Sequence, residues 1–223
     1  MDNVCKAIHF NRVWLSGQVA AEPELSHSNH DQVFFRFFLS VQRLSGQCDV
    51  LPVMISRHQL QLTPLHRGQH ICLTGQLRSF NNKSGDGPRL ILSVLARQVD
   101  VCQGEDSNTI RLCGTICKPP TFRRTPLGRE ICDVILAVNR RYGRADYLPC
   151  ICWGAVAQQT AALPVGSTLA LEGRIQSRSY TKKQPDGCCE RIAYEVSVMR
   201  PLRPEEWAEK EGGHCIQTPG VVY

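Results

Sequence analysis

The stretch ADYLPCICWGAVA, residues 145–157, carries two aromatic side chains at a spacing that could serve a flat ligand. Side chains alternate along an extended strand, so Tyr147 and Trp153 share one face, while Leu148, Cys150 and Cys152 share the other. Both faces are largely apolar, although one face is enough to build a core. The face with the two rings is therefore either also buried inside the protein or open to a ligand that stacks on the rings.

Other reactive side chains do not form the patterns that metal binding or catalysis needs. The twelve cysteines include close pairs at 113 and 117, 150 and 152, and 188 and 189, but no CxxC pair followed by a second pair at finger spacing. The chain is also long for a secreted disulfide scaffold. We expect reduced cysteines that pack as small hydrophobic residues, and no metal or cofactor.

A hydrolytic site is not favoured either. Metal-dependent hydrolysis needs clustered carboxylates beside an open coordination position. The acids Asp133, Asp146, Glu172 and Glu195 each stand alone in a separate predicted strand, and the seven histidines form no HxH or HExxH pair. We therefore expect no enzyme and no catalytic residue, with a barrel-based nuclease as the enzymatic alternative.

Composition points to a folded protein whose modest positive charge fits either an ordinary soluble surface or an anionic partner. The chain has 223 residues, 42% of them hydrophobic and 21% charged, with a net charge of +6. That length suits one large or two ordinary domains. No apolar run approaches the roughly 18 residues of a membrane span, and the start lacks the apolar core of a secretory signal. These features predict a cytoplasmic protein without a membrane partner.

The two halves of the chain repeat one another. NRVWLSGQV at 11–19 aligns with NTIRLCGTI at 108–116, and CDVLPVMIS at 48–56 aligns with ADYLPCICW at 145–153, both at an offset of 97. Gly75 and Gly173 continue the alignment at an offset of 98. We expect two copies of one domain, at residues 1–100 and 106–202, and a short tail at 203–223 that begins with a helical turn and is loosely ordered at its end.

Each copy is mainly β. In the second copy the expected strands are 109–117, 131–138, 146–153, 168–180 and 191–199, and the Ala-rich stretch GAVAQQTAALPVG predicts a short helix between the third and fourth strands. RHQLQLTPLHRG supplies the same helix in the first copy. This order is that of the oligonucleotide/oligosaccharide-binding (OB) fold, a five-stranded Greek-key barrel. Mid-strand glycines, among them Gly75 and Gly173, are expected to mark bulges or sharp bends.

The second copy resembles the bacterial single-stranded DNA-binding protein family through LAVNR, ADYLPCICWG and GSTLALEGRIQSRSY, in that order. The resemblance covers most of residues 108–200. The first copy is more faintly similar, and its LPVMISRHQ is also similar to primosomal replication protein N, a relative with the same barrel.

The resemblance implies that single-stranded DNA wraps across the barrel. It places the aromatic stacking sites on Tyr142, Tyr147, Trp153 and Tyr180. Basic side chains, which would hold phosphates, interleave with these rings at Arg140, Arg141, Arg144, Arg174, Arg178, Lys182 and Lys183, with few acids between them. Stacking contributes about 1–3 kcal/mol per base and accepts any base, so such a groove binds without sequence preference.

The alternative is that the rings lie in the barrel core or at a subunit contact. FRRTPLGR either extends the groove with Arg123, Arg124 and Arg129 or forms an exposed hairpin tip.

The first copy lacks these rings. The positions equivalent to the four stacking sites are Ser45, Val50, Ser56 and Asn82. Its aromatic residues instead crowd into VFFRFF, where Phe34, Phe35, Phe37 and Phe38 occupy both faces of one strand. We expect the outer pair to be covered by the sister barrel or by a second subunit.

Two functions follow from the resemblance. The first is sequence-tolerant binding that protects single strands in DNA replication, repair or recombination, with a homodimer supplying the four barrels common in the family. The alternative is a primosome-type assembly protein that mainly binds other proteins, possible replication or repair partners among them. Family members that recruit such enzymes end in an acidic, hydrophobic peptide, whereas this sequence ends CIQTPGVVY, which puts recruitment by the usual tail in doubt.

Overall fold

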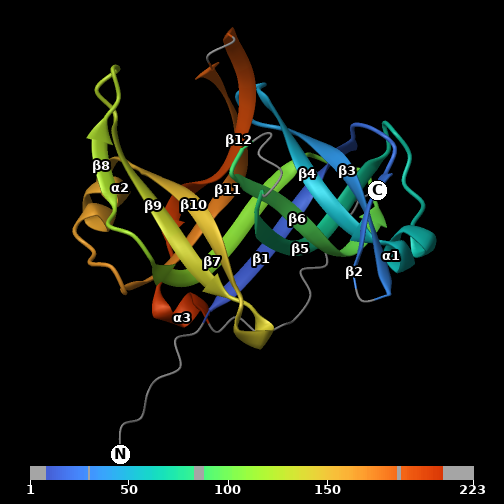
Figure 1. Ribbon diagram of the computed structural model, residues 1–223, viewed down its shortest axis with the longest axis horizontal. Coiled ribbons are helices and arrows are strands. Elements are labelled where there is room, and N and C mark those ends of the chain that lie inside the picture. Colours follow the sequence, from blue (N-terminus) through green and yellow to red (C-terminus); the bar gives the residue numbers. More distant parts are fainter. Residues whose placement is uncertain (1–8, 30, 83–87, 185–186, 208–223) are drawn as a thin grey trace, which may run out of the picture.

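The computed structural model describes residues 9–207, except 30, 83–87 and 185–186, and only the backbone at 182–184 and 187–189. It consists of two barrels side by side (Figure 1). The first barrel closes in the order β1, β3, β4, β6, β5 and back to β1. Its strands are β1 (Phe10–Val19), β3 (Gln32–Gln42), β4 (Cys48–Ser56), β5 (His70–Asn81) and β6 (Leu90–Val101).

The second barrel repeats this order with β7, β9, β10, β12 and β11. Its strands are β7 (Ser107–Ile116), β9 (Glu130–Asn139), β10 (Ala145–Trp153), β11 (Thr168–Gln184) and β12 (Gly187–Pro201). Helices α1 (Arg57–Leu62) and α2 (Gly154–Ala161) follow the third barrel strand of each copy, and a short helix α3 (Pro204–Trp207) follows β12. The predicted tandem OB fold is confirmed.

Two short strands were not predicted. β2 (Glu24–Asn29) pairs with β3, and β8 (Thr121–Arg124) pairs with β9, each outside its barrel. Every residue of both strands is exposed. They therefore carry no buried apolar alternation from which a strand could be inferred.

Alternation along the strands builds the two cores. In β4 the buried positions are 49, 51, 53 and 55, and in β10 they are 146, 148, 150 and 152, together with Ile151 from the other face. Of the glycines predicted to mark bends, Gly75 and Gly173 lie at register shifts in β5 and β11. At Gly173 a Cβ atom would lie 2.4 Å from the carbonyl oxygen of Ser197, so only glycine lets the two strands approach this closely.

The phenylalanines of β3 divide between its two faces as expected. Phe37 is buried and Phe35 packs against the core. On the outer face, Phe34 stacks on His27 of β2, with ring centroids 5.2 Å apart, and the Arg36 guanidinium lies over Phe38. Within the chain, Phe34 is therefore contacted by β2, which pairs with its own barrel, and not by the sister barrel, which was one of the two covers that we expected.

Antiparallel pairing between β1 and β7 joins the barrels into one continuous sheet. Val13 pairs with Ile110, its own equivalent at the repeat offset of 97, so the joint has an approximate two-fold axis. The side chains flanking the joint repeat as well. Asn11 exchanges two hydrogen bonds with the backbone of Leu77, and Asn108 exchanges two with Ile175.

Two buried aspartates cross the barrel–barrel junction in the same symmetric way. Asp49 of the first barrel accepts hydrogen bonds from the backbone N–H of Ser177 at 2.8 Å and from its own neighbour Arg43 at 2.6 Å. Its equivalent, Asp146 of the second barrel, accepts one from the backbone N–H of Ser79 at 2.7 Å. Both aspartates are fully buried, so each anion depends on these donors for its stability.

Acid is expected to weaken the junction through Asp49. Burial raises its pKa, but hydrogen bonds from Arg43 and Ser177 outweigh burial and hold the pKa below its ordinary value of 3.8. A depressed pKa in the folded state contributes stability above the unfolded value, and this contribution is lost as the pH falls through the folded pKa. Urea unfolding of the native chain should therefore lose more stability between pH 7 and about pH 3 than unfolding of Asp49→Asn. Equal losses would contradict this role.

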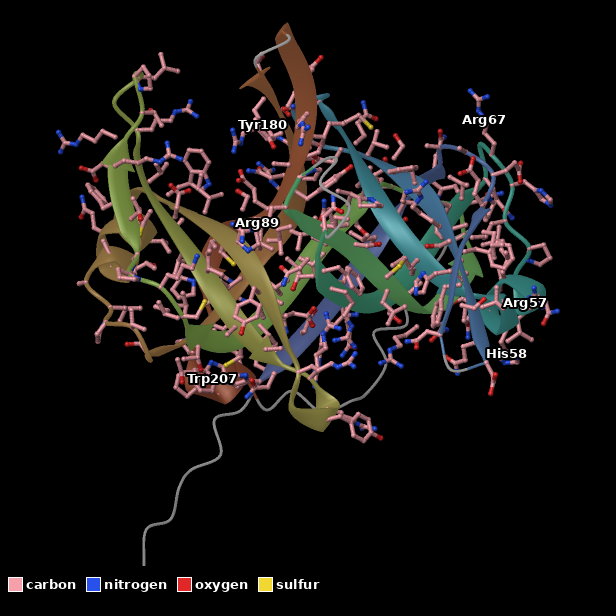
Figure 2. All side chains as sticks on the ribbon, viewed as in Figure 1. Arg57, His58, Arg67, Arg89, Tyr180 and Trp207 are labelled. Atoms are coloured by element: carbon pink, nitrogen blue, oxygen red, sulfur yellow. The ribbon has the colours of Figure 1, made fainter. Side chains whose placement is uncertain are left out.

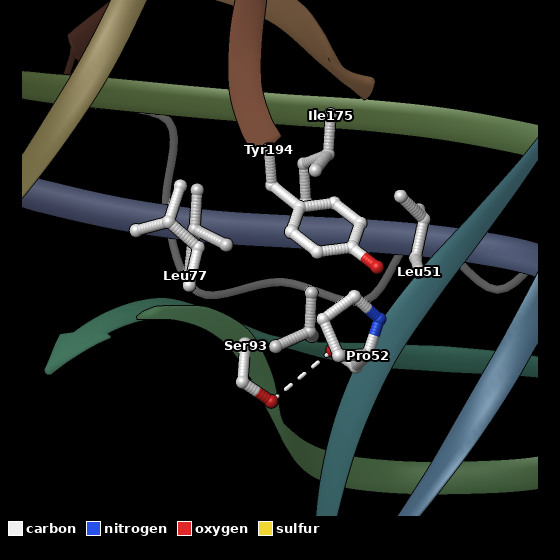
Figure 3. Close-up of a pocket in the computed structure, with 8 residues that line it drawn as sticks. Leu51, Pro52, Leu77, Ser93, Ile175 and Tyr194 are labelled. Atoms are coloured by element: carbon white, nitrogen blue, oxygen red, sulfur yellow. Dashed lines mark hydrogen bonds between the residues drawn. The ribbon is translucent and has the colours of Figure 1, made fainter. Parts of the chain in front are cut away.

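Tyr194 completes the junction from the second barrel. Figure 3 shows its ring reaching from β12 towards Leu51 and Pro52 of the first barrel, with Leu77 and Ile175 alongside. The gap among these residues is too small for a water molecule, and burial raises the pKa of the Tyr194 phenol. The barrels are thus packed tightly against each other.

Candidate nucleic-acid interface

The two rings of β10 lie outside the barrel interior. Leu148, Cys150 and Cys152 are at most 2% exposed, whereas Tyr147 is 50% exposed and Trp153 is half-buried. Indole Nε1 of Trp153 donates a hydrogen bond to Ser197 Oγ of β12 at 3.1 Å. Tyr147 is thus open to solvent, and Trp153 is held by its edge. Between them on this outer face, Ile151 is only 5% exposed.

Arg174 joins this row from the neighbouring strand. Ser197 pairs with Ile151 on one side and with Arg174 on the other, so Trp153, Ser197 and Arg174 lie across one outer surface. Nε of Arg174 is buried and has no hydrogen-bond partner within the described part of the chain. A buried donor without an acceptor is costly, and a bound phosphate or base would supply that acceptor.

The β11–β12 ribbon carries the next predicted pair. Figure 2 shows Tyr180 on this ribbon, which extends beyond the barrel, and the Arg178 guanidinium lies 5.9 Å from the ring centroid. Arg178 also lies 3.9 Å from Glu195, but the arginine side chain is 59% exposed, so this pair is weak. Lys182 and Lys183 continue the strand, with side chains outside those that the structure describes.

Tyr142 lies at the other end of the barrel, on the turn η1 (Arg141–Gly143) between β9 and β10. In Figure 1 this turn lies at the bottom of the view and the β11–β12 ribbon at the top. Tyr142 is 97% exposed, has the left-handed φ of 65°, and is flanked by exposed Arg141 and Arg144. A tyrosine rarely adopts this conformation, so the exposed ring is maintained at some cost in backbone energy.

Arg140 has a different environment from the other predicted basic residues. Its guanidinium binds both carboxylate oxygens of Asp146 and donates to the carbonyl oxygen of Ser79 at 2.9 Å. It also lies over the ring of Phe80, at 5.5 Å. Arg78 of the first barrel contacts the same carboxylate at 2.9 Å. Arg140 therefore belongs to the barrel–barrel junction.

This junction also positions the stacking strand, which was not predicted. The backbone N–H of Tyr147 donates to Ser79 Oγ at 2.8 Å, so a side chain of the first barrel fixes the backbone at the exposed ring. The signal in the sequence was the repeat itself, because CDVLP and ADYLP place Asp49 and Asp146 at equivalent positions.

Acidic residues from neighbouring strands lie on the same outer face as Trp153 and Arg174. Strand pairing brings them there, although few acids lie near the basic residues along the sequence. Glu195 accepts a hydrogen bond from Gln176 at 2.9 Å, and Asp133 accepts one from Arg123 at 2.7 Å. Arg124 pairs with Glu130 in the same way. The FRRTPLGR segment is thus an exposed hairpin in which Arg123 and Arg124 are neutralised by β9.

Within the described residues, no group of three or more His, Cys, Asp or Glu side chains is arranged to hold a metal ion. None of the helices there is long and apolar enough to cross a membrane. The described cysteines are free thiols, and burial raises the pKa of several, to about 11 for Cys113 and Cys152.

Comparison with known proteins decides the family. The model of the single-strand binding protein family matches residues 107–200. The single-stranded DNA-binding protein of Clostridium tetani is 35% identical over 111 residues, a match that covers 47% of this chain and 74% of that protein. Single-stranded DNA-binding protein B of Bacillus subtilis is 37% identical, over 46% of this chain and 98% of that protein. The chain belongs to the single-strand binding protein family.

A tandem relative matches both halves. The single-stranded DNA-binding protein of Thermus aquaticus is 26% identical over 95% of this chain and 92% of its own length. Its wild-type crystal structure has the same fold, with a TM-score of 0.72 over 89% of this chain and 94% of that chain, at 23% identity.

The two barrels of this single-strand binding family member differ at the ends of their third strands. Ser56 is the N-cap of α1, and its hydroxyl accepts the backbone N–H of Gln59. Trp153 occupies the equivalent N-cap of α2 and makes no side-chain capping bond. A missing cap costs about 1 kcal/mol, so the tryptophan is unfavourable for the helix itself. Earlier in the same strand, the first-barrel equivalent of Tyr147 is Val50, which is 41% exposed but has no aromatic ring.

Proposed function

We propose that this protein binds single-stranded DNA without sequence preference through its second barrel, residues 106–202. In this proposal the first barrel, residues 1–100, supports the second barrel, and residues 203–223 form a short tail. The printed names of the relatives support this function, since those proteins are single-stranded DNA-binding proteins. Binding of this kind requires no catalytic residue or cofactor, and it would protect unpaired strands in replication, repair or recombination.

The observation that carries the proposal is Trp153. It occupies a position where a capping side chain would stabilise α2, it lies outside the core, and its ring nitrogen is fixed by Ser197. Beside it, the unpartnered Nε of Arg174 supplies a donor for a phosphate or base. A fixed aromatic surface beside a guanidinium group whose Nε has no partner among the described residues suits stacking together with phosphate binding.

The proposed DNA path runs from the η1 turn across β10 to the β11–β12 ribbon. Bases would stack on Tyr142, Tyr147, Trp153 and Tyr180, and phosphates would contact Arg141, Arg144, Arg174, Arg178 and Lys182. Arg140 instead acts as a positioning residue, because its donors are engaged by Asp146 and Ser79.

Removing one phosphate contact should change the salt dependence of binding. Arg178→Ala is expected to weaken oligonucleotide binding equally for all sequences and to lower the slope of log affinity against log salt by about 0.7. The measurement is a set of fluorescence titrations with oligo-dT and oligo-dA at several salt concentrations.

The matched control is Arg57→Ala, an exposed arginine on α1 of the first barrel, far from Tyr180 in the view of Figure 2. It should leave the slope unchanged. An unchanged slope for Arg178→Ala would exclude that residue from the path.

For assembly, we propose a cytoplasmic, nucleoid-associated homodimer, which would supply four barrels. Light scattering should then give twice the chain mass of 25.0 kDa. The first barrel lacks the stacking rings, which is compatible with a second function, that of a primosome-type assembly protein. A pull-down that recovers a helicase or primase without DNA, together with weak oligonucleotide binding, would favour that function.

A further inference from the structure

The segment between the two barrels is fastened to the first barrel by a row of three side chains. Sγ of Cys102 lies 3.4 Å from Nδ1 of His70, and Nε2 of the same ring lies 3.0 Å from Oδ1 of Asp106. The other carboxylate oxygen of Asp106 accepts the backbone N–H of Gln42 at 2.6 Å. A carboxylate only accepts hydrogen bonds, so the neutral ring carries its proton on Nε2 and offers Nδ1 to the thiol.

A second thiol adjoins the first. Cys72 lies two residues after His70, on the same face of β5. The backbone N–H of Cys102 donates to the carbonyl oxygen of His70 at 3.1 Å. The two cysteines therefore lie diagonally across neighbouring chain segments. Burial, and after it a hydrogen bond to the Cys102 thiol, raise the pKa of Cys72 to about 11. The two thiols therefore occupy diagonal positions on adjacent chain segments, and the Cys102 thiol lies beside the ring nitrogen of His70.

The other described cysteines lack this combination. Cys113, Cys132, Cys150 and Cys152 are buried in the barrels. Cys117 is partly buried and donates to the carbonyl oxygen of Ile135, and Cys48 is exposed and interacts with the hydroxyl of Ser40. Among the described cysteines, only Cys102 has a histidine partner. We propose that Cys102 and Cys72 form a peroxide-sensitive thiol pair, in which His70 activates Cys102 and Cys72 resolves the oxidised sulfur.

The chemistry balances with hydrogen peroxide as the oxidant. The Cys102 proton passes to Nδ1 of His70, and the thiolate attacks one peroxide oxygen. The O–O bond breaks, the leaving hydroxide takes up the proton as water, and Cys102 becomes a sulfenic acid. The Cys72 sulfur then attacks the Cys102 sulfur, the S–O bond breaks, and a second water leaves with the Cys72 proton. Two thiols and one peroxide give one disulfide and two waters.

The structure provides access and the required freedom of movement. Cys102 and Cys72 are only partly buried, and a hollow of about 250 Å³, lined by residues that include Cys48, reaches the Asp106 end of the row. Diagonal neighbours across antiparallel strands have Cα atoms about 7–8 Å apart, slightly beyond disulfide range. Cys102 follows the last residue of β6, so this irregular segment can close the gap by a small shift. Closure would draw Cys102 away from His70 and displace the connection to β7.

Peptide mapping tests the pair. The full-length protein is treated with hydrogen peroxide under non-denaturing conditions, free thiols are alkylated, and the digest is analysed by mass spectrometry. Trypsin separates the two residues into peptides 68–78 and 98–111. We expect these two peptides to appear as one disulfide-linked species that a dithiol reductant separates, and Cys102 to react at least about tenfold faster than Cys48.

Variants assign the roles. In Cys72→Ser, Cys102 should accumulate as a sulfenic acid trapped by dimedone, and in His70→Gln its reaction should slow to the rate of Cys48. Cys48→Ser is the matched control and should leave the link intact. A digest in which Cys102 stays reduced while Cys48 oxidises, or in which Cys102 links elsewhere, would overturn the pair. An unchanged rate in a folded His70→Gln variant would overturn the activation.

Discussion

The Tyr147→Ala, Trp153→Ala double variant is expected to lose about 2–6 kcal/mol of oligonucleotide affinity, since each base stacked on an aromatic ring contributes about 1–3 kcal/mol. That corresponds to a rise of roughly thirty-fold to twenty-thousand-fold in the dissociation constant. The fold should survive, because neither ring belongs to the buried core. Fluorescence anisotropy of labelled oligo-dT measures the loss, and urea unfolding checks the fold.

Two controls separate stacking from general disturbance. Tyr147→Phe keeps the ring and should keep most of the affinity. Val50→Ala alters the equivalent position of the first barrel, and we expect no change in binding. Tryptophan quenching alone would be ambiguous, because Trp14 and Trp207 also fluoresce and Trp207 packs near Leu202. Unchanged affinity in the double variant would reject the aromatic surface.

Asp146→Ala should cause the largest loss of stability among single variants at the barrel–barrel junction. The carboxylate is fully buried and contacts the guanidinium groups of Arg78 and Arg140 and the backbone of Ser79. Removing it leaves two mostly buried cations without a counter-charge, and breaking a buried pair in this way costs about 3–5 kcal/mol. Urea or guanidinium unfolding, with the slope checked for two-state behaviour, measures the change.

The comparison variant is Asp133→Ala, which removes the partner of Arg123 on the surface. Those side chains are 41% and 51% exposed, so we expect a loss below about 1 kcal/mol. Asp49→Ala, at the equivalent position of the first barrel, should resemble Asp146→Ala, although its carboxylate faces one arginine rather than two. If Asp146→Ala were no more destabilising than Asp133→Ala, the junction would not depend on this carboxylate.

Strand alternation and the internal repeat were sufficient to predict the fold. The same alternation separated the outer rings of β10 from its buried face, because the period of a strand is independent of its partners. Short exposed strands such as β2 escaped prediction, since they contribute no apolar pattern. The stacking of Phe34 on His27 was missed for the same reason, because His27 lies on that unpredicted strand.

The candidate site was predictable only in part. Proximity in sequence grouped Arg140 with Tyr142, whereas folding turns its guanidinium towards the first barrel. Strand pairing also brings Glu195 beside Arg178, although they are separated by seventeen positions in the chain. Contacts between strands depend on register, which local sequence does not specify. The support that Ser79 gives to Tyr147 depends on the packing of two domains and could be recognised only from the structure.

Ultraviolet crosslinking of a long oligo-dT to the intact protein, followed by mass-spectrometric mapping, tests the central claim most directly. A base stacked on an aromatic side chain is well placed to form a photoadduct with it. We expect adducts on Tyr147, Trp153 and Tyr180, and none on the Val50 and Ser56 segment of the first barrel. Adducts confined to the first barrel, with the second barrel unmodified, would contradict the account.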